Sequence, residues 1–397
     1  MTEDRPDQAV ARTPTLLTKL PTVGTTIFTV MSALATEKGA VNLGQGFPDF
    51  ACDPVLVQAV TEAMTQGLNQ YPPMPGVALL REAVAAKIAA LHQRSYRAAD
   101  EITITAGATQ AILTAILAVV RSGEEVIVLE PCYDSYAPNI ELAGGRVVRV
   151  PLAPGSFRPN FDLIAAAITR RTRAILINSP HNPTATVWSE ADMLRLQELL
   201  APTDILVVSD EVYEHMVYDG RQHLSVARFP GLAARAFVVS SFGKTYHVTG
   251  WKVGTVAAPA TLSAEFRKVH QFNVFTVNTP VQHGLARYMA DPRPYLDLPA
   301  FYQRKRDLFR AGLERTRLRL LPSEGSYFQC VDISGLRGSE RDLSEADFCQ
   351  WLTSEVGVAA IPLSAFYGDG YDQRVVRFCF AKEDETLNTA LQRLAKL

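Results

Sequence analysis

The sequence has few cysteines and no excess of charge of either sign, and both absences exclude classes of function. Its five cysteines are scattered through 397 residues without Cys-x-x-Cys spacing, which argues against a disulfide framework and a zinc site. The 39 lysines and arginines are balanced by 41 aspartates and glutamates, so no basic surface for nucleic acid or an anionic membrane is expected. We therefore expect neither a bound metal nor a polyanionic partner.

We expect neither an export signal nor a membrane-spanning segment. Its opening segment, Met1 to Asp7, is polar and acidic, without the basic and apolar regions of a signal peptide. No uncharged run reaches membrane-spanning length. We expect a protein of the reducing cytoplasm. With 47% hydrophobic and 20% charged residues, the chain can bury a large core and form two unequal domains.

The stretch 238–254 carries the residue on which the functional argument depends, Lys244. Its apolar beginning predicts a buried strand, followed by a small-residue loop that carries this lysine. The stretch is not a phosphate-binding P-loop, because that motif needs another glycine five residues before Gly243. A solvated surface lysine is the simpler alternative. Ser241 and Lys252 flank Lys244, and both are residue types that bind phosphate.

A second candidate for anion binding is the stretch 102–110, where a strand is expected to meet a helix at 110–120. Gly107, Ala108 and Thr109 lie at this junction, where free backbone N–H groups and the helix dipole favour an anion. Such turns are common in α/β proteins. The junction therefore indicates a phosphate site only in combination with Ser241 and Lys252.

Further buried strands alternate with helical patterns along the middle of the chain. We expect these strands at 125–130, 146–152, 173–178, 205–210 and 236–240. This alternation predicts a mostly parallel sheet between helices, with functional groups at the carboxyl ends of the strands. Asp210 lies at such an end, and Tyr133, Asn182 and Tyr213 follow such ends. Each has a simpler explanation as a turn, a helix cap or a core aromatic residue.

The last hundred residues change character and predict a smaller α/β domain. Three short strands are expected at 326–331, 357–362 and 374–380. The third strand carries Arg377 between apolar neighbours, so its side chain needs an anionic partner. That partner is either an internal carboxylate or a ligand.

Taken in order, these motifs resemble the pyridoxal 5'-phosphate (PLP)-dependent class I/II aminotransferases of fold type I. Three stretches look most like bacterial methionine aminotransferases and the related kynurenine aminotransferases: Ser-Phe-Gly-Lys-Thr-Tyr-His-Val-Thr-Gly-Trp-Lys-Val-Gly, Asn-Leu-Gly-Gln-Gly-Phe-Pro-Asp-Phe and Gly-Val-Ala-Ala-Ile-Pro-Leu-Ser. The resemblance covers nearly the whole chain. It implies an N-terminal arm with part of the small domain at 1–45, a large PLP-binding domain with a mostly parallel seven-stranded sheet at 46–290, and a small C-terminal α/β domain at 291–397.

The resemblance also implies a role for each cofactor residue. Lys244 would bind C4′ of PLP, Asp210 would keep the pyridine nitrogen protonated, and Tyr133 would stack on the ring. The phenolate oxygen would contact Asn182 and Tyr213, while the phosphate would bind Gly107, Ala108, Thr109, Ser241 and Lys252. Lys252 departs from the family, where an arginine is more common, so a point charge replaces a bidentate fork.

On the substrate side, the resemblance implies that Arg377 binds the α-carboxylate with a bidentate pair of hydrogen bonds. Gly46, Phe47, Asn182 and Phe366 would surround the substrate. For Gly46 and Phe47, a tight turn with a core phenylalanine is the simpler alternative. Tyr71 would cross to the PLP phosphate of a neighbouring subunit, which implies a homodimer with shared sites.

The implied reaction is transfer of an amino group from methionine, or from aromatic and large apolar amino acids, to a 2-oxo acid with ping-pong kinetics. The pocket rings Phe47, Tyr71, Tyr136 and Phe366 favour such side chains, and no second arginine stands out for an acidic one. A PLP-dependent carbon–sulfur β-lyase and a kynurenine aminotransferase remain open alternatives. An aminotransferase-like transcription regulator would need an N-terminal winged-helix domain, so we expect an enzyme.

Overall fold

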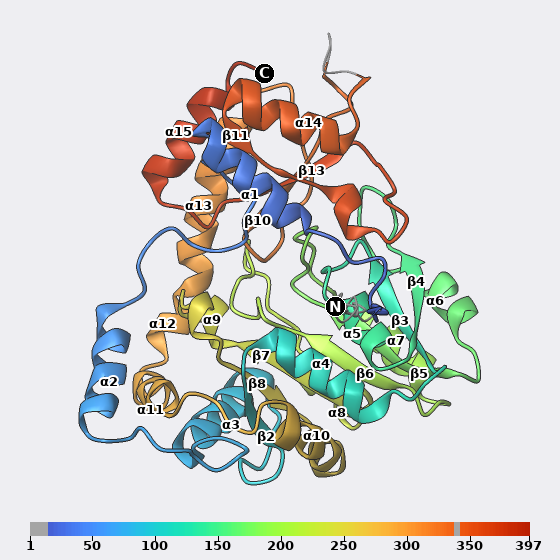
Figure 1. Cartoon of the computed structure of the whole chain (residues 1–397), viewed down its shortest axis with the longest axis vertical. Helices are drawn as coiled ribbons and strands as arrows, with labels where there is room; N and C mark the ends of the chain where they lie inside the picture. Colours follow the sequence, from blue (N-terminus) through green and yellow to red (C-terminus); the bar gives the residue numbers. More distant parts are fainter. Residues whose placement is uncertain (1–14, 337–341) are drawn as a thin grey trace, which may run out of the picture.

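The computed structural model describes residues 15–336 and 342–397, and its largest element is a seven-stranded sheet (Figure 1). The strand order is β2-β8-β7-β6-β5-β3-β4. The strands from β7 to β4 are parallel, whereas β8 is antiparallel to β7 and to β2. The strands are β2 (Ile102–Thr105), β3 (Glu125–Glu130), β4 (Arg146–Pro151), β5 (Thr172–Asn178), β6 (Leu206–Asp210), β7 (Ala236–Ser241) and β8 (Gly254–Ala257). The expected mostly parallel sheet is confirmed.

Helices cover both faces of this sheet. Val126 and Val128 of β3 pack in one core, while Ile127 and Leu129 pack in the other, as the alternation of a strand requires. The helices are α2 (Pro54–Thr65), α3 (Ala78–His92), α4 (Ala108–Val119), α5 (Tyr136–Leu142), α6 (Phe161–Ala167), α7 (Glu190–Leu200), α8 (Pro230–Ala233), α9 (Phe242–Thr245), α10 (Ala260–Asn273) and α11 (Thr279–Tyr288), with short 3₁₀ turns at Val226–Arg228 and Thr249–Trp251.

The C-terminal region forms a second layer of structure above the large sheet (Figure 1). Its antiparallel sheet has the order β12-β13-β10-β9. The elements are α12 (Arg293–Leu296), α13 (Leu298–Leu313), β9 (Arg319–Leu320), β10 (Phe328–Asp332), α14 (Glu345–Trp351), a π turn (Leu352–Val356), β11 (Val358–Ala359), β12 (Ile361–Pro362), a 3₁₀ turn (Leu363–Phe366), β13 (Val375–Cys379) and α15 (Asp384–Leu394).

The N-terminal elements α1 (Ile27–Lys38) and β1 (Val41–Asn42) pack on this C-terminal region. Strand β1 pairs in parallel with β11, which joins the two ends of the chain. Residues 1–14 of the expected N-terminal arm lie outside the described residues. The division of the chain after residues 45 and 290 stays a prediction.

Two local expectations differ from the structure. The strand expected at 357–362 is two strands, because β11 pairs with β1 and β12 pairs with β13. All six of these residues except Gly357 are buried. The apolar run is therefore continuous in sequence and does not show where the chain passes from one sheet to the other. The expected loop around Lys244 is the single helical turn α9, closed by Tyr246 N–H donating to the Phe242 carbonyl at 2.8 Å. One turn is too short to show helical periodicity.

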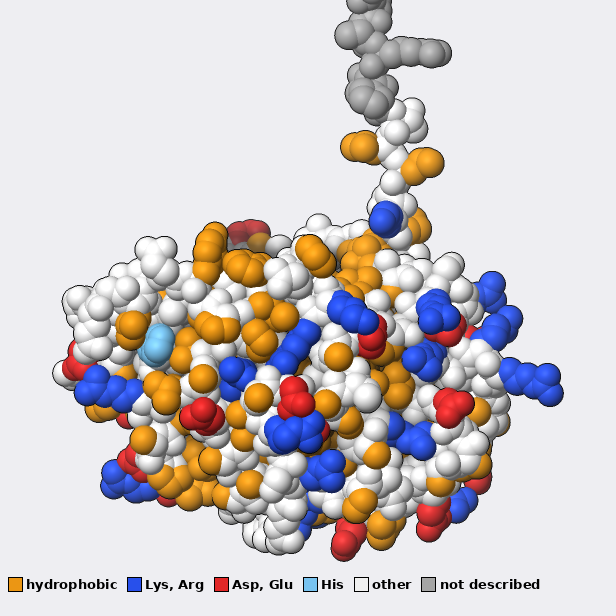
Figure 2. All heavy atoms as spheres, turned by 90° about the horizontal axis from the view of Figure 1, so that it is seen from below, with side chains coloured by type: hydrophobic (Ala, Val, Ile, Leu, Met, Phe, Trp, Pro, Cys, Tyr) orange, Lys and Arg blue, Asp and Glu red, His pale blue; other side chains and the backbone are white. Residues whose placement is uncertain are grey.

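One face of the molecule has a chemically mixed surface. Figure 2 shows positive, negative and apolar side chains interspersed on the face that it presents, in agreement with the nearly balanced composition. Within 15–336 and 342–397, no helix is both long and apolar enough to cross a bilayer.

Candidate active site

A cavity of about 320 Å³ lies between the carboxyl ends of β5, β6 and β7 and the strands β10 and β13 of the C-terminal region. Most of the residues predicted for the site line it: Gly46, Phe47, Gly107, Ala108, Thr109, Tyr133, Asn182, Asp210, Tyr213, Ser241, Lys244, Lys252 and Arg377. They come from segments spread over most of the chain, and the crossovers of the parallel sheet bring them together. Tyr71 and Phe366 are not among the lining residues, and their surroundings are described below.

Lys244 projects into this cavity from α9, directly after β7. Its Nζ donates to the Tyr327 hydroxyl at 2.8 Å and to the Gly46 carbonyl at 3.1 Å. Burial lowers the pKa of this amine to about 8, and the nearby charge of Arg377 acts in the same direction. An amine with such a pKa can be present in its neutral, nucleophilic form close to physiological pH.

Asp210 is the last residue of β6 and is buried in the same cavity. Its Oδ2 accepts a hydrogen bond of 2.6 Å from the Tyr136 hydroxyl, and its Oδ1 accepts one of 3.3 Å from Val212 N–H. Burial raises the pKa of this carboxyl to about 6, although the bond from Tyr136 opposes the shift. A cationic ring nitrogen placed beside Asp210 would favour its ionised form.

Tyr136 lines the cavity, where the sequence placed it among the pocket rings, and its contact with the substrate stays a prediction. The sequence did not indicate that its hydroxyl also donates to Asp210. Asn178, at the end of β5, is a residue that the sequence did not single out. Its amide donates to the Asp210 carbonyl at 2.8 Å, and its Oδ1 accepts from Asn182 N–H at 2.8 Å. Asn178 thus ties together two segments that carry predicted site residues.

An anion cradle lies at the start of α4. Gly107 has φ +80°, and a Cβ there would lie 3.3 Å from Lys252 Nζ, so the ammonium group lies beside this helix N-terminus. A Cβ on Gly254 would lie 3.2 Å from Ala108 N, so this glycine allows β8 to approach the same turn. Ser241 lines the same cavity. Free N–H groups, a cation and a hydroxyl together suit a phosphate.

Arg377 is almost completely buried on β13, with 1% of its surface exposed. It donates to Asn182 Oδ1 at 2.6 Å and to the Gly44 carbonyl at 3.0 Å. Its Nε has no partner among the described residues. Burial lowers the pKa of the guanidinium, which shows that its charge is poorly solvated. Such a group can bind an anionic ligand. The two neutral oxygens that it now contacts offset its charge less well than a carboxylate would.

Aromatic rings enclose the guanidinium of Arg377. The Phe328 ring lies 4.0 Å away, the Phe366 ring 4.9 Å and the Phe28 ring 5.4 Å, each measured from the ring centroid to Cζ. Phe366 therefore contacts the arginine although it does not line the cavity itself. These rings make a flat apolar frame for the arginine.

Tyr71 lies apart from the other predicted residues. Its side chain is 80% exposed in the single chain, and its ring packs edge-on against Phe275 with centroids 5.2 Å apart. The single chain therefore does not bring Tyr71 into the cavity. Its expected contact with a neighbouring subunit stays a prediction.

The groups in the cavity fit PLP. The cradle at Gly107 suits its phosphate, and Tyr133 offers a ring beside it. Among residues 15–336 and 342–397, Asp210 has no cationic partner within hydrogen-bond distance. Lys244 supplies an amine with a lowered pKa for the aldehyde. Arg377 lines the same cavity without a carboxylate partner among the described residues and could bind a second anion.

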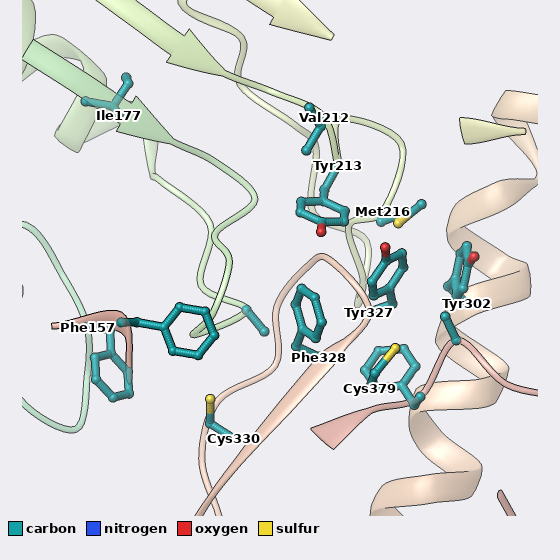
Figure 3. Close-up of a cluster of buried hydrophobic side chains, with 14 of the residues drawn as sticks. Phe157, Ile177, Val212, Tyr213, Met216, Tyr302, Tyr327, Phe328, Cys330 and Cys379 are labelled. Atoms are coloured by element: carbon teal, nitrogen blue, oxygen red, sulfur yellow. The ribbon is translucent and has the colours of Figure 1, made fainter. Parts of the chain in front are cut away.

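Tyr327 is a further residue that sequence reasoning missed. It is fully buried, and Figure 3 shows its hydroxyl beside that of Tyr213. Their rings pack edge-to-face with centroids 5.1 Å apart. Its position immediately before an apolar strand gave no signal of function, because a core aromatic residue looks the same in sequence.

Comparison with known proteins gives a consistent result along the whole chain. The family model for aminotransferase class I and II matches residues 38–394. A solved structure of YbdL from Escherichia coli, described as a methionine aminotransferase, has a TM-score of 0.94 at 50% identity and covers 97% of this chain and 100% of its own.

Three curated relatives match over similar lengths. The methionine aminotransferase of Escherichia coli (strain K12) is 51% identical, with 96% of this chain and 97% of the relative covered. A probable N-succinyldiaminopimelate aminotransferase of Mycobacterium tuberculosis is 40% identical, with 96% and 98% covered. The kynurenine–oxoglutarate transaminase 1 of Homo sapiens is 35% identical, with 91% and 93% covered.

Proposed function

Because the chain belongs to the class I and II aminotransferases, which are PLP-dependent enzymes, we propose that it transfers the amino group of methionine to a 2-oxo acid. The observation that carries this proposal is the position of Lys244 and Arg377 in one cavity. One is an amine with a pKa lowered to about 8, and the other is a buried guanidinium without a carboxylate partner among the described residues.

PLP would be held at both of its ends in this cavity. The N-terminus of α4 and the side chains of Ser241 and Lys252 would bind the phosphate, Asn182 and Tyr213 the phenolate, and Asp210 the ring nitrogen. When bound, the cofactor supplies an electron sink for the electrons of the bond to the substrate α-hydrogen. The hydrogen bond from Tyr136 would keep the carboxylate of Asp210 directed at the ring.

Arg377 would bind the substrate, and Lys244 would transfer its proton. Arg377 would exchange its bonds to Asn182 and Gly44 for a bidentate pair to the substrate carboxylate, which fixes the amino acid in place. Lys244, once released from the cofactor, would take the α-proton as a general base, since burial favours its neutral form. Both half-reactions would use the same two residues, and the first 2-oxo acid would leave before the second binds, which gives ping-pong kinetics.

Methionine is favoured by the lining of the cavity. Phe28, Phe47 and Phe328 contribute aromatic surface, and a thioether contacts ring edges favourably. Among the described lining residues, Arg377 is the single arginine. A second carboxylate on the substrate would therefore be buried without a bidentate partner.

The ratio of kcat/KM for methionine to that for aspartate, measured with one common 2-oxo acid, tests this proposal. We expect a preference for methionine of at least about 100-fold, because an unpaired buried charge costs about 3 kcal/mol or more. Norleucine is the matched control, since it keeps the length of methionine without the sulfur. A preference for aspartate would refute the proposal. A carbon–sulfur β-lyase would instead split S-methylcysteine into methanethiol, pyruvate and ammonia, and a higher kcat/KM for that reaction than for transamination of methionine would replace the proposal with the lyase.

Kynurenine aminotransferase activity is the second candidate, favoured by the similarity to the human kynurenine–oxoglutarate transaminase 1. Phe47 is 44% exposed at the mouth of the cavity, so a larger aromatic side chain could displace it without disturbing a core. Including kynurenine in the same substrate series distinguishes a methionine enzyme from one of broader specificity.

We further propose that the enzyme is a cytoplasmic homodimer in which Tyr71 serves the neighbouring subunit. A tyrosine exposed by 80% in the single chain, beside the ring of Phe275, has an apolar surface that a second chain could cover. Mixing Tyr71→Ala chains with Lys244→Ala chains should restore part of the activity, because one site of the heterodimer keeps both residues.

The mixing experiment requires that each variant alone is badly impaired and that subunits exchange, which mass spectrometry of the mixture can verify. The control is each variant mixed with itself under the same conditions. Failure to recover activity in verified heterodimers would refute the shared site, while the assignment of Lys244 would be unaffected.

A further inference from the structure

The hydroxyl of Tyr327 lies against the amine of Lys244, and Tyr327 is outside the set of residues that the family motifs supplied. We propose that Tyr327, together with the Gly46 carbonyl, holds the released amine of Lys244 so that its lone pair stays free to accept the substrate α-proton. This inference rests on the proposed function of Lys244. Tyr327 is thus a positioning residue for the general base.

The hydrogen bonds around the amine carry this inference. The Tyr327 hydroxyl donates to the Gly46 carbonyl, so its oxygen lone pairs are available to accept from Lys244 Nζ, 2.8 Å away. Nζ also donates to the Gly46 carbonyl at 3.1 Å. A neutral amine has two hydrogens and one lone pair. The two acceptors use both hydrogens and leave the lone pair for the proton.

Tyr327 is suited to hold the amine and unsuited to replace it as the base. Burial raises the pKa of its hydroxyl well above the ordinary value, so it remains protonated. Its ring is fixed between Tyr213, Phe328 and Tyr302, with centroids 5.1, 4.9 and 5.8 Å away (Figure 3). A rigid acceptor orients the amine at little entropic cost.

The simpler explanation, a core aromatic residue, does not account for the hydroxyl. A phenylalanine would fill the same space among these rings, but it would deprive the buried Lys244 amine of one of its two acceptors. Tyr302 shows the contrast. It is also fully buried, but its hydroxyl has no partner among the described residues and does not contact Lys244.

Tyr327→Phe tests the inference, and Tyr302→Phe is the matched control because it removes a buried hydroxyl from the neighbouring ring. The single-turnover rate with methionine should fall about tenfold or more in Tyr327→Phe. The rate difference between methionine and α-deuterated methionine should grow, since proton transfer becomes slower. KM should stay within about twofold, because Arg377 is untouched. Tyr302→Phe should behave as the wild type.

A measurement on the apoenzyme provides a readout that does not depend on turnover. The pH dependence of acylation at Lys244, followed by mass spectrometry of its peptide, reports the pKa of the amine. Tyr327→Phe should lower this pKa further, because the charged form loses an acceptor, whereas Tyr302→Phe should not change it. Thermal unfolding of both variants verifies that each is folded.

Identical kinetics and identical acylation profiles in the two variants would overturn the inference. Loss of covalent cofactor attachment in Tyr327→Phe would also overturn it, because the hydroxyl would then be needed to build the site. Covalent attachment that survives in Lys244→Ala would instead refute the proposed function on which the inference rests.

Discussion

Replacing Lys244 by alanine should abolish the absorption band of the lysine-bound cofactor and lower kcat by at least about 10⁴-fold, because one residue supplies both the nucleophile and the general base. The anion cradle and Asp210 are untouched by the change, so PLP should remain bound without a covalent link. Absorption spectra and steady-state rates of the purified variant test the two expectations separately.

Lys252→Ala is the matched control, since it removes another lysine from the same cavity. Lys252 Nζ lies beside Gly107 in the phosphate cradle, so this variant should bind PLP more weakly. At saturating PLP it should nevertheless keep the absorption band. Normal transamination by Lys244→Ala, or loss of the band in Lys252→Ala alone, would contradict the assignment of these two lysines.

The large sheet could be predicted from the sequence because its central strands are buried on both faces. Glu125–Glu130 was predicted with the bounds that β3 has in the structure, and the other central strands with bounds that differ by one residue. Continuous β-branched runs give this signal. The short strands at 357–362 could not be separated, because their pairing depends on partners far away in sequence.

The site residues could be predicted where a reactive residue type lies at the end of a predicted strand. Lys244 follows a buried strand and Asp210 ends another, the resemblance gave each a role, and both line the cavity. Tyr136 and Tyr327 could not be assigned in this way. Each acts through a hydrogen bond to a residue distant in sequence, and no pattern encodes such a contact.

Arg377→Ala should raise KM for methionine strongly while PLP stays bound. Removing one partner of a buried charge pair costs about 2–5 kcal/mol, which corresponds to roughly 30- to 5,000-fold. The guanidinium contacts Asn182 and Gly44 and is framed by the Phe328 ring, so its loss affects the substrate end of the cavity. Titrations with methionine and with PLP, followed by absorption, measure the two affinities independently.

Arg377→Lys separates charge from geometry. Lysine keeps the positive charge but cannot make a bidentate pair of hydrogen bonds to a carboxylate. The KM of Arg377→Lys for methionine should therefore lie between those of the wild type and of Arg377→Ala. Arg377 also packs between aromatic rings, and a purely structural role would weaken PLP and methionine binding together. Equal loss of both affinities would therefore refute a carboxylate-binding role. A selective loss for methionine, partly restored by lysine, is the result that only direct contact with the substrate predicts.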